Sequence, residues 1–368
     1  MRGTHVHTTS YIGRVARSFI PQGLGKRLVA GATAVLMGAA LVSCSELPSQ
    51  GETTSLSGED TITPSSEANA ASETRNLGLP KSAPLVGPEP GESKTTNLAS
   101  GRSFILHVPE NYEPGKKWPV VLAFHGWKET AGMMQRYTEL NAADAIMVYP
   151  SGVERAWAPA PYAKTTGEED TQFASDIVDS LRATYAVDDD RIFATGMSNG
   201  GGFAAYLGCQ LPNIFKSVAT VSAAYYQAIH ASCKGEPVGR LDMHGTLDPV
   251  VDYYGGTRHK ERYVAVQEVA AMDAQRNLCE GNLRTERLAN NALLVQWEQC
   301  QRPVQHIRIG GGQHVWPGGT YDKDSEVGDG FATDKVLDFF GIPGRPAGME
   351  EAATVETGTM EENELSES

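Results

Sequence analysis

Acidic residues are absent from the start of this 368-residue chain, where no Asp or Glu precedes Cys44. The same stretch carries five basic residues, and the last two, Lys26 and Arg27, come just before an apolar run from Leu28 to Val42. That run is shorter than the roughly 20 apolar residues that span a bilayer. A basic flank before a short apolar run is typical of a secretory signal.

The apolar run ends in Leu-Val-Ser-Cys, which resembles the lipobox of bacterial lipoproteins. We therefore predict that residues 1–43 are a lipoprotein signal peptide and that Cys44 is lipidated. The alternatives are a cleaved signal with an incidental cysteine and an uncleaved signal anchor. All of them predict an extracellular protein, held at the cell membrane or secreted.

A surplus of basic residues is also missing. Removing the five leader residues from the 31 basic ones leaves 26 against 45 acidic residues, a formal charge of −19. Such a surface repels phosphate backbones, so we expect no nucleic-acid partner.

Aromatic residues are missing from residues 45–93 and from the tail after Gly344. Both segments are polar and cannot bury enough apolar surface to offset their ordering entropy. The sequence therefore predicts a disordered tether over 44–94 and a disordered acidic tail over 346–368. Between them lies one predicted catalytic domain, residues 95–345.

Short apolar runs alternate with helical periodicity in that domain. The predicted strands are SFILHV, WPVVLAF, AIMVYP, RIFAT, SVATVSA, RLDMH and HIRIG. The predicted helices include FASDIVDSLRATYA, YVAVQEVAAMDAQRNL and GFATDKVLDFFGI. This alternation predicts an α/β fold with a mostly parallel central sheet and helices on both faces. In such sheets the site lies at the carboxyl ends of the strands.

Ser198 lies in the stretch TGMSNGGG, with the spacing Gly-x-Ser-x-Gly. Chance produces that spacing often in a chain with 39 glycines, so its context must decide. The stretch follows a predicted strand and precedes a helical pattern, as a nucleophile elbow requires. A phosphate-binding loop would need a lysine and a hydroxyl after the glycines, and neither is present.

A serine nucleophile needs a histidine base and a carboxylate that orients it. Asp248 and His314 follow predicted strands in the order Ser, acid, His that α/β-hydrolases use. We predict these three residues as the catalytic triad. Asp248 could instead be a turn former, and Asp242 and Asp252 are neighbouring carboxylates; Asp242, inside a strand, is the weaker candidate.

An oxyanion hole needs two backbone N–H groups, one from the residue after the nucleophile. We predict Asn199 and Trp127, which follows the strand end FHGW; the alternative is an ordinary strand-to-loop turn. Trp127, Trp157 and Trp316 are candidates for a flat apolar substrate pocket, and Trp157 and Trp316 are the two that we assign to substrate binding; core or rim packing is the alternative. DKDSEVGDG lacks the glycine and glutamate of a calcium loop, so no metal is predicted.

Four cysteines follow the leader. An even number in an exported protein suggests disulfides, and three connectivities are possible. The four residues are Cys209, Cys233, Cys279 and Cys300.

Taken together, FHGW, YPSG, GMSNGG, HGTLDPVV and GGQHVWPGG resemble the secreted esterases that include poly(3-hydroxybutyrate) depolymerases, feruloyl esterases and acetylxylan esterases. The resemblance spans about residues 95–345 and implies the α/β-hydrolase fold. It also implies the triad and oxyanion donors named above, and disulfides that join Cys209 to Cys233 and Cys279 to Cys300.

The sequence thus predicts a membrane-tethered extracellular serine esterase without a cofactor. Its partners would be an ester substrate, which could be linked to a polysaccharide or be a polyester, and the membrane. The predicted substrates are short-chain acyl, feruloyl or hydroxyalkanoate esters. The alternatives are an acyltransferase acting on an envelope sugar or lipid, and a non-catalytic envelope-binding lipoprotein.

Overall fold

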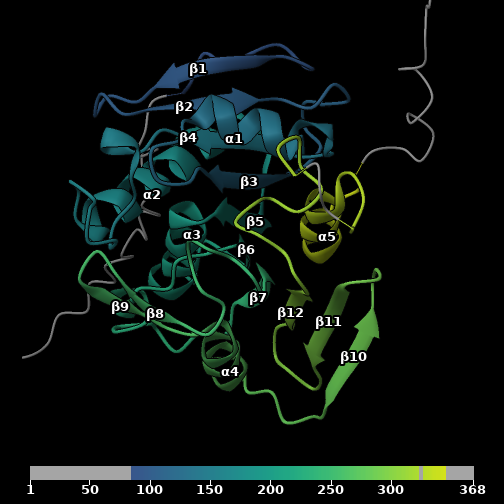
Figure 1. Cartoon of the computed structure of the whole chain (residues 1–368). Coiled ribbons are helices and arrows are strands. Elements are labelled where there is room, and N and C mark those ends of the chain that lie inside the picture. Colours follow the sequence, from purple (N-terminus) through teal and green to yellow (C-terminus); the bar gives the residue numbers. More distant parts are fainter. Residues whose placement is uncertain (1–83, 323–325, 345–368) are drawn as a thin grey trace, which may run out of the picture. The chain divides into compact units, whose positions relative to one another are not determined.

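The computed structural model describes residues 84–322 and 326–344 (Figure 1). The predicted signal peptide, Cys44, the acidic tail and most of the tether lie outside these residues. Within them, no helix is long and apolar enough to cross a membrane.

Ten strands form one sheet, in the order β1-β2-β4-β3-β5-β6-β7-β12-β11-β10 (Figure 1). Their bounds are β1 Ser93–Asn97, β2 Ser103–His107, β3 Trp118–Phe124, β4 Ile146–Pro150, β5 Val187–Met197, β6 Ser217–Val221, β7 Gly239–Gly245, β10 Leu283–Arg287, β11 Ala292–Trp297 and β12 Val304–Ile309. The six strands from β4 to β12 pair in parallel, and antiparallel strands extend both edges. A small hairpin, β8 (Gly256–Arg258) with β9 (Glu261–Tyr263), stands apart.

Helices cover both faces of the sheet. Helices α1 (Ala131–Thr138) and α5 (Phe331–Phe340) pack on one face, and α2 (Gly167–Thr184) and α3 (Asn199–Gln210) pack on the other. Helix α4 (Val266–Arg276) joins α3 through a third apolar cluster. The predicted α/β-hydrolase architecture is confirmed.

The sequence patterns account for the central layers. Strands β3, β4, β6 and β7 are buried at every position, as expected of a parallel sheet covered on both sides. In α2, the four-residue spacing of Phe173, Ile177 and Leu181 places all three in the core. A capping box between Thr166 and Glu169 begins that helix.

The predicted tether ends too late. Leu85 packs against the core cluster under α2, and its N–H donates to Thr184 Oγ1 at 2.8 Å. Strand β1, which begins at Ser93, pairs along its whole length with β2. The folded domain therefore includes residues 84–94, where the polar composition hid an edge strand exposed at four of its five positions.

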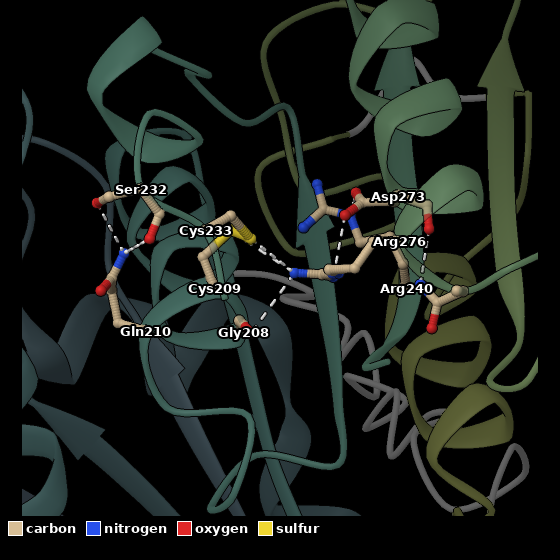
Figure 2. The surroundings of a disulfide bond; sticks show 9 residues. Gly208, Cys209, Gln210, Ser232, Cys233, Arg240, Asp273 and Arg276 are labelled. Carbon is tan, nitrogen blue, oxygen red and sulfur yellow. Dashed lines mark hydrogen bonds and ion pairs between the residues drawn. A yellow bond between two sulfur atoms is a disulfide. The ribbon is translucent and has the colours of Figure 1, made fainter. Parts of the chain in front are cut away.

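Two disulfides are present, Cys209–Cys233 and Cys279–Cys300. Figure 2 shows the first one beside α4, where Arg276 Nη1 lies 3.2 Å from the Cys233 sulfur. Asp273 bridges Arg276, at 3.0 Å, to Arg240 of β7, at 3.3 Å (Figure 2). All three charged side chains are at least nine-tenths buried, so each relies on the others to offset desolvation.

Asp242 extends this buried network along β7. Its carboxylate accepts from the hydroxyl of Tyr225, which also accepts from Arg240 Nη2 at 2.7 Å. The other oxygen lies 2.8 Å from His306 Nδ1. Burial raises the pKa of Asp242, but the hydrogen bond and charge of His306 outweigh it and lower the pKa to about 2. The histidine that contacts Asp242 is thus His306 and not His314.

We expect Asp242→Asn to destabilise the fold by about 3 to 5 kcal/mol, because it leaves buried charged partners unmatched. The pKa of Asp242 is about 2 in the folded protein and about 3.9 in the unfolded chain. Its ionised form therefore stabilises the fold above about pH 3.9, and this stabilisation is lost as the pH falls through about 2. Between pH 5 and pH 2, the free energy of unfolding measured in urea should therefore fall further in the wild type than in the variant, by on the order of 2 kcal/mol. Parallel curves for the two proteins would contradict this role; the exposed Asp252→Asn is the control.

Candidate active site

Ser198 occupies a sharp turn between β5 and α3. Its φ of 54° and ψ of −118° are strained for a residue with a side chain. Three main-chain hydrogen bonds hold it there. Its N–H donates to Val221 O at 2.9 Å, and its carbonyl accepts from Gly202 N at 3.0 Å and Ala224 N at 3.1 Å.

The flanking glycines permit this turn through their size. A Cβ at Gly196 would collide with the backbone of Gly200, and a Cβ at Gly200 would collide with the carbonyl of Phe124 at the end of β3. The strand, the helix and the β3 loop therefore approach too closely for any side chain. The glycine-rich stretch is a packed elbow rather than a flexible loop.

Asp248 and His314 meet at the carboxyl edge of the sheet. His314 Nδ1 lies 2.7 Å from Asp248 Oδ2. Asp248 Oδ1 accepts from the N–H groups of Val250 and Val251, each at 2.8 Å. The two loops are joined by the N–H of Gly311, which donates to Thr246 Oγ1 at 2.9 Å.

A second histidine, His244, contacts the same carboxylate. Its Nε2 lies 3.3 Å from Asp248 Oδ2 and 2.9 Å from Val251 O. Burial raises the pKa of Asp248, but hydrogen bonds from His244 and His314 outweigh it and hold the pKa well below its usual range. Asp248 is therefore a carboxylate across the whole physiological range. The only sequence signal for His244 is its place in HGTLD, four residues before Asp248, and its contact with that carboxylate becomes visible only in the fold.

Ser198 and His314 belong to neighbouring loops. The hydroxyl of Ser222, next to the Val221 that receives the Ser198 N–H, donates to Val315 O at 3.1 Å. Among the described residues, no hydrogen bond joins Ser198 Oγ to His314 Nε2. Long nucleophile–base contacts are common in enzymes without substrate.

The two predicted oxyanion donors lie on loops that meet at the elbow. Asn199 is the first residue of α3, so its N–H has no partner within the helix. The backbone hydrogen bonds of the described residues also leave the Trp127 N–H unused. Between these loops, His125 accepts from Gly152 N at 3.1 Å, and its Nδ1 contacts Gly126 O at 2.8 Å. Burial lowers the pKa of His125 to about 4, consistent with a neutral ring that props the loop.

The side chain of Asn199 has a structural role that its sequence motif does not reveal. Its Oδ1 accepts from Trp157 N at 2.8 Å, and its Nδ2 donates to Trp157 O at 2.9 Å. Asp170, wholly buried, holds the same loop by accepting from Ala158 N at 2.9 Å and from Arg102 at 2.6 Å. The loop before α2 is thereby clamped to the residue after Ser198.

The proposed substrate-binding tryptophans require correction. Trp157 is 0% exposed and stacks against Phe203, with ring centroids 5.2 Å apart. Trp316 is 3% exposed and donates from its indole to Thr333 Oγ1 at 3.0 Å. Both are core residues, because the apolar layers beside the sheet take up their rings. Trp127, in contrast, is only half-buried.

The described residues contain no group of three or more His, Cys, Asp or Glu side chains placed to hold a metal ion. The elbow, the Asp248–His314 pair and the two unused N–H groups together make an arrangement suited to acyl transfer through a serine.

Comparison with known proteins agrees with this chemistry. The Esterase family, described as "Putative esterase", matches residues 95–319, and the chain belongs to that family. It is a carboxylic-ester hydrolase.

The individual relatives share only modest sequence identity with this chain. The chain is 27% identical over 268 residues to "Probable feruloyl esterase C" of Aspergillus terreus, covering 69% of this chain and 89% of the relative. It is 27% identical over 271 residues to feruloyl esterase C of Emericella nidulans, covering 70% and 90%. A solved acetyl xylan esterase from Aspergillus awamori aligns with a TM-score of 0.48 and 15% identity, covering 68% of this chain and 99% of that chain.

The Asn199 clamp leads to a kinetic prediction. Asn199→Ala should lower kcat on a small nitrophenyl ester by about 10- to 100-fold and change KM little. The reason is that losing the clamp loosens the predicted oxyanion donor, which acts in the transition state, and leaves ground-state binding of the ester unchanged. Asn213→Ala, at an exposed position, is the matched control. A folded Asn199→Ala enzyme with wild-type kcat would show that the clamp does not position the donor.

Proposed function

We propose that this chain is a serine esterase held outside the cell membrane by a lipid on Cys44. Its substrates would be short-chain acyl, feruloyl or hydroxyalkanoate esters. The observation that carries the catalytic proposal is the Asp248–His314 contact of 2.7 Å at the same sheet edge as the strained Ser198. The names of the relatives favour the feruloyl arm.

The proposed reaction has two halves. Ser198 Oγ attacks the ester carbonyl while His314 Nε2 takes the hydroxyl proton, and the N–H groups of Asn199 and Trp127 bind the oxyanion. Collapse breaks the ester C–O bond, and His314 gives its proton to the leaving alcohol. Water then attacks the acyl-enzyme, with His314 as base again, and releases the acid and free Ser198.

Asp248 has a fixed part in both halves. With Oδ1 held by two backbone N–H groups, its Oδ2 faces His314 Nδ1. That contact keeps the Nδ1–H tautomer and so leaves Nε2 able to accept the serine proton. It also stabilises the imidazolium formed after proton transfer.

We expect Ser198→Ala and His314→Ala to abolish turnover of a nitrophenyl ester. Asp248→Asn should lower kcat by about 10⁴-fold, since it favours the wrong tautomer. The matched control is Asp252→Asn, four residues along the same loop and exposed, which should keep wild-type activity. Activity retained in Ser198→Ala, or an equal loss in both Asp variants, would reject these assignments.

The lipid anchor has a separate test. In cells that process bacterial lipoproteins, the wild-type chain should partition into the detergent phase of a phase-separation assay. Cys44→Ala should move it to the aqueous phase, because the acyl chains attach to that sulfur and the new N-terminus. Equal partitioning of the two proteins would reject lipidation at Cys44.

A further inference from the structure

Trp127 belongs to an aromatic cluster at the edge of the elbow. Its indole stacks on Tyr162 with ring centroids 4.4 Å apart, and His259 meets both rings edge-on, at 5.0 Å and 4.8 Å. Tyr226 joins Tyr162 at 6.2 Å. These residues come from the β3 loop, the loop before α2, the β6 loop and the β8–β9 hairpin. Trp127 and Tyr162 are half-buried and His259 is exposed, so the cluster reaches solvent.

Two features tie this cluster to the proposed catalytic loops. Trp127 is itself the proposed oxyanion donor. Tyr226 lies two residues after Ala224, whose N–H donates to Ser198 O at 3.1 Å. The cluster therefore lies on loops that adjoin the turn of Ser198.

Three cations lie on the loops that carry the aromatic cluster. Lys128 Nζ lies 4.2 Å from the centre of the Trp127 ring. Arg155 donates to Lys128 O at 3.1 Å and accepts at its own carbonyl from Lys128 N at 2.8 Å. Arg258 donates to Val250 O at 2.9 Å, and the N–H of Val250 donates to Asp248 Oδ1. One cation is thus fixed to the oxyanion loop and another to the triad-acid loop.

In the part of the chain that the structure describes, no carboxylate forms an ion pair with these cations. The ion pairs of residues 84–322 and 326–344 include none of the three. Glu129, next to Lys128, points inward to Gly126 N at 2.9 Å and the Tyr137 hydroxyl at 3.0 Å. Glu261 lies opposite Arg258 in the hairpin register without forming an ion pair. A local positive field is left on a chain with a formal charge of −14.

The neighbouring histidine responds to that field. Burial, and after it the charges of Arg258 and Lys128, lower the pKa of His259 below 6.5. His259 therefore presents a neutral ring near pH 7, so that an apolar surface bordered by cations faces solvent.

We propose that Lys128, Arg155 and Arg258 form an anion-binding rim, and that the preferred substrate is an ester that carries a free carboxylate close to the ester bond. This rests on the proposed esterase function and adds the substrate's charge class. The hydrocarbon or ring of such a substrate lies on Trp127 and Tyr162, while its carboxylate faces the cations. The carboxylate can belong to the acyl part, as in a half-ester of a dicarboxylic acid, or to the alcohol part, as in an acidic sugar.

The test compares esters matched in size. For the acyl part, mono-(4-nitrophenyl) adipate is compared with 4-nitrophenyl hexanoate; for the alcohol part, 4-acetoxyphenylacetate is compared with 4-methylphenyl acetate. Wild-type kcat/KM should favour the anionic ester in at least one pair. Because the cations are exposed, this preference should shrink at 0.5 M salt, where the screening length falls to about 4 Å.

Charge-removing variants locate the effect. Lys128→Met with Arg258→Met should lower kcat/KM on the preferred anionic ester by about 5- to 10-fold, mainly through KM, and on its neutral match by less than about 2-fold. When Arg258→Lys replaces Arg258→Met in this double variant, part of the preference for the anionic ester should return. The matched control is Lys335→Met on α5, which should leave kcat/KM on both esters unchanged. Equal losses on both esters, or a wild-type preference for neutral esters in both pairs, would overturn the proposal.

A binding measurement separates this proposal from the catalytic one. Hydrolysis of the neutral esters, and its loss in Ser198→Ala, tests the esterase function alone. Calorimetric titration of Ser198→Ala with monophenyl adipate, or with 4-acetoxyphenylacetate if that pair shows the preference, tests the rim without turnover. Binding should weaken at least 5-fold when Lys128→Met and Arg258→Met are added. Unchanged binding would reject the rim even if the enzyme is active.

Discussion

The strained backbone of Ser198 is the constraint on which the rest of the site depends. Its φ of 54° is maintained because its N–H and carbonyl are bound on three sides by main-chain groups. Those groups belong to α3, to the end of β6 and to the loop that follows β6. The close approach to β3 is possible only without side chains at Gly196 and Gly200. The elbow thereby fixes Ser198, the proposed nucleophile, relative to the start of α3 and to the β3 loop that carries the proposed oxyanion donor Trp127.

Buried polar contacts along β7 stabilise the carboxyl edge of the sheet, where the site lies. The β7 strand carries Arg240, Asp242 and His244 on its way to the loop of Asp248, and each has a buried partner. Asp242 and Asp248 are six residues apart and contact different histidines: Asp242 contacts His306, whereas Asp248 contacts both His244 and His314. Asp248 shares its carboxylate with the partly exposed His314 side chain, whereas Asp242 is enclosed with His306 in the core.

Much of this arrangement could be predicted from the sequence. The parallel strands are continuous apolar runs, and the glycines, Asp248 and His314 mark strand ends, so pattern and chain order sufficed. The edge strands β1 and β10 are exposed at nearly every position, and apolar periodicity could not reveal them. The roles of Trp157, Trp316 and the Asn199 side chain depend on contacts between distant loops. Such contacts decide whether an indole lines a pocket or fills a core, and composition alone carries no trace of them.

The central claim, that Ser198 is a nucleophile activated in the folded protein, can be measured directly. Residues 84–344 would be incubated with a fluorophosphonate and examined by intact mass and peptide mapping. The account predicts one phosphonyl adduct per chain, located on Ser198 and lost when the protein is unfolded in urea beforehand. An unmodified protein, or an adduct on a different serine, would contradict it.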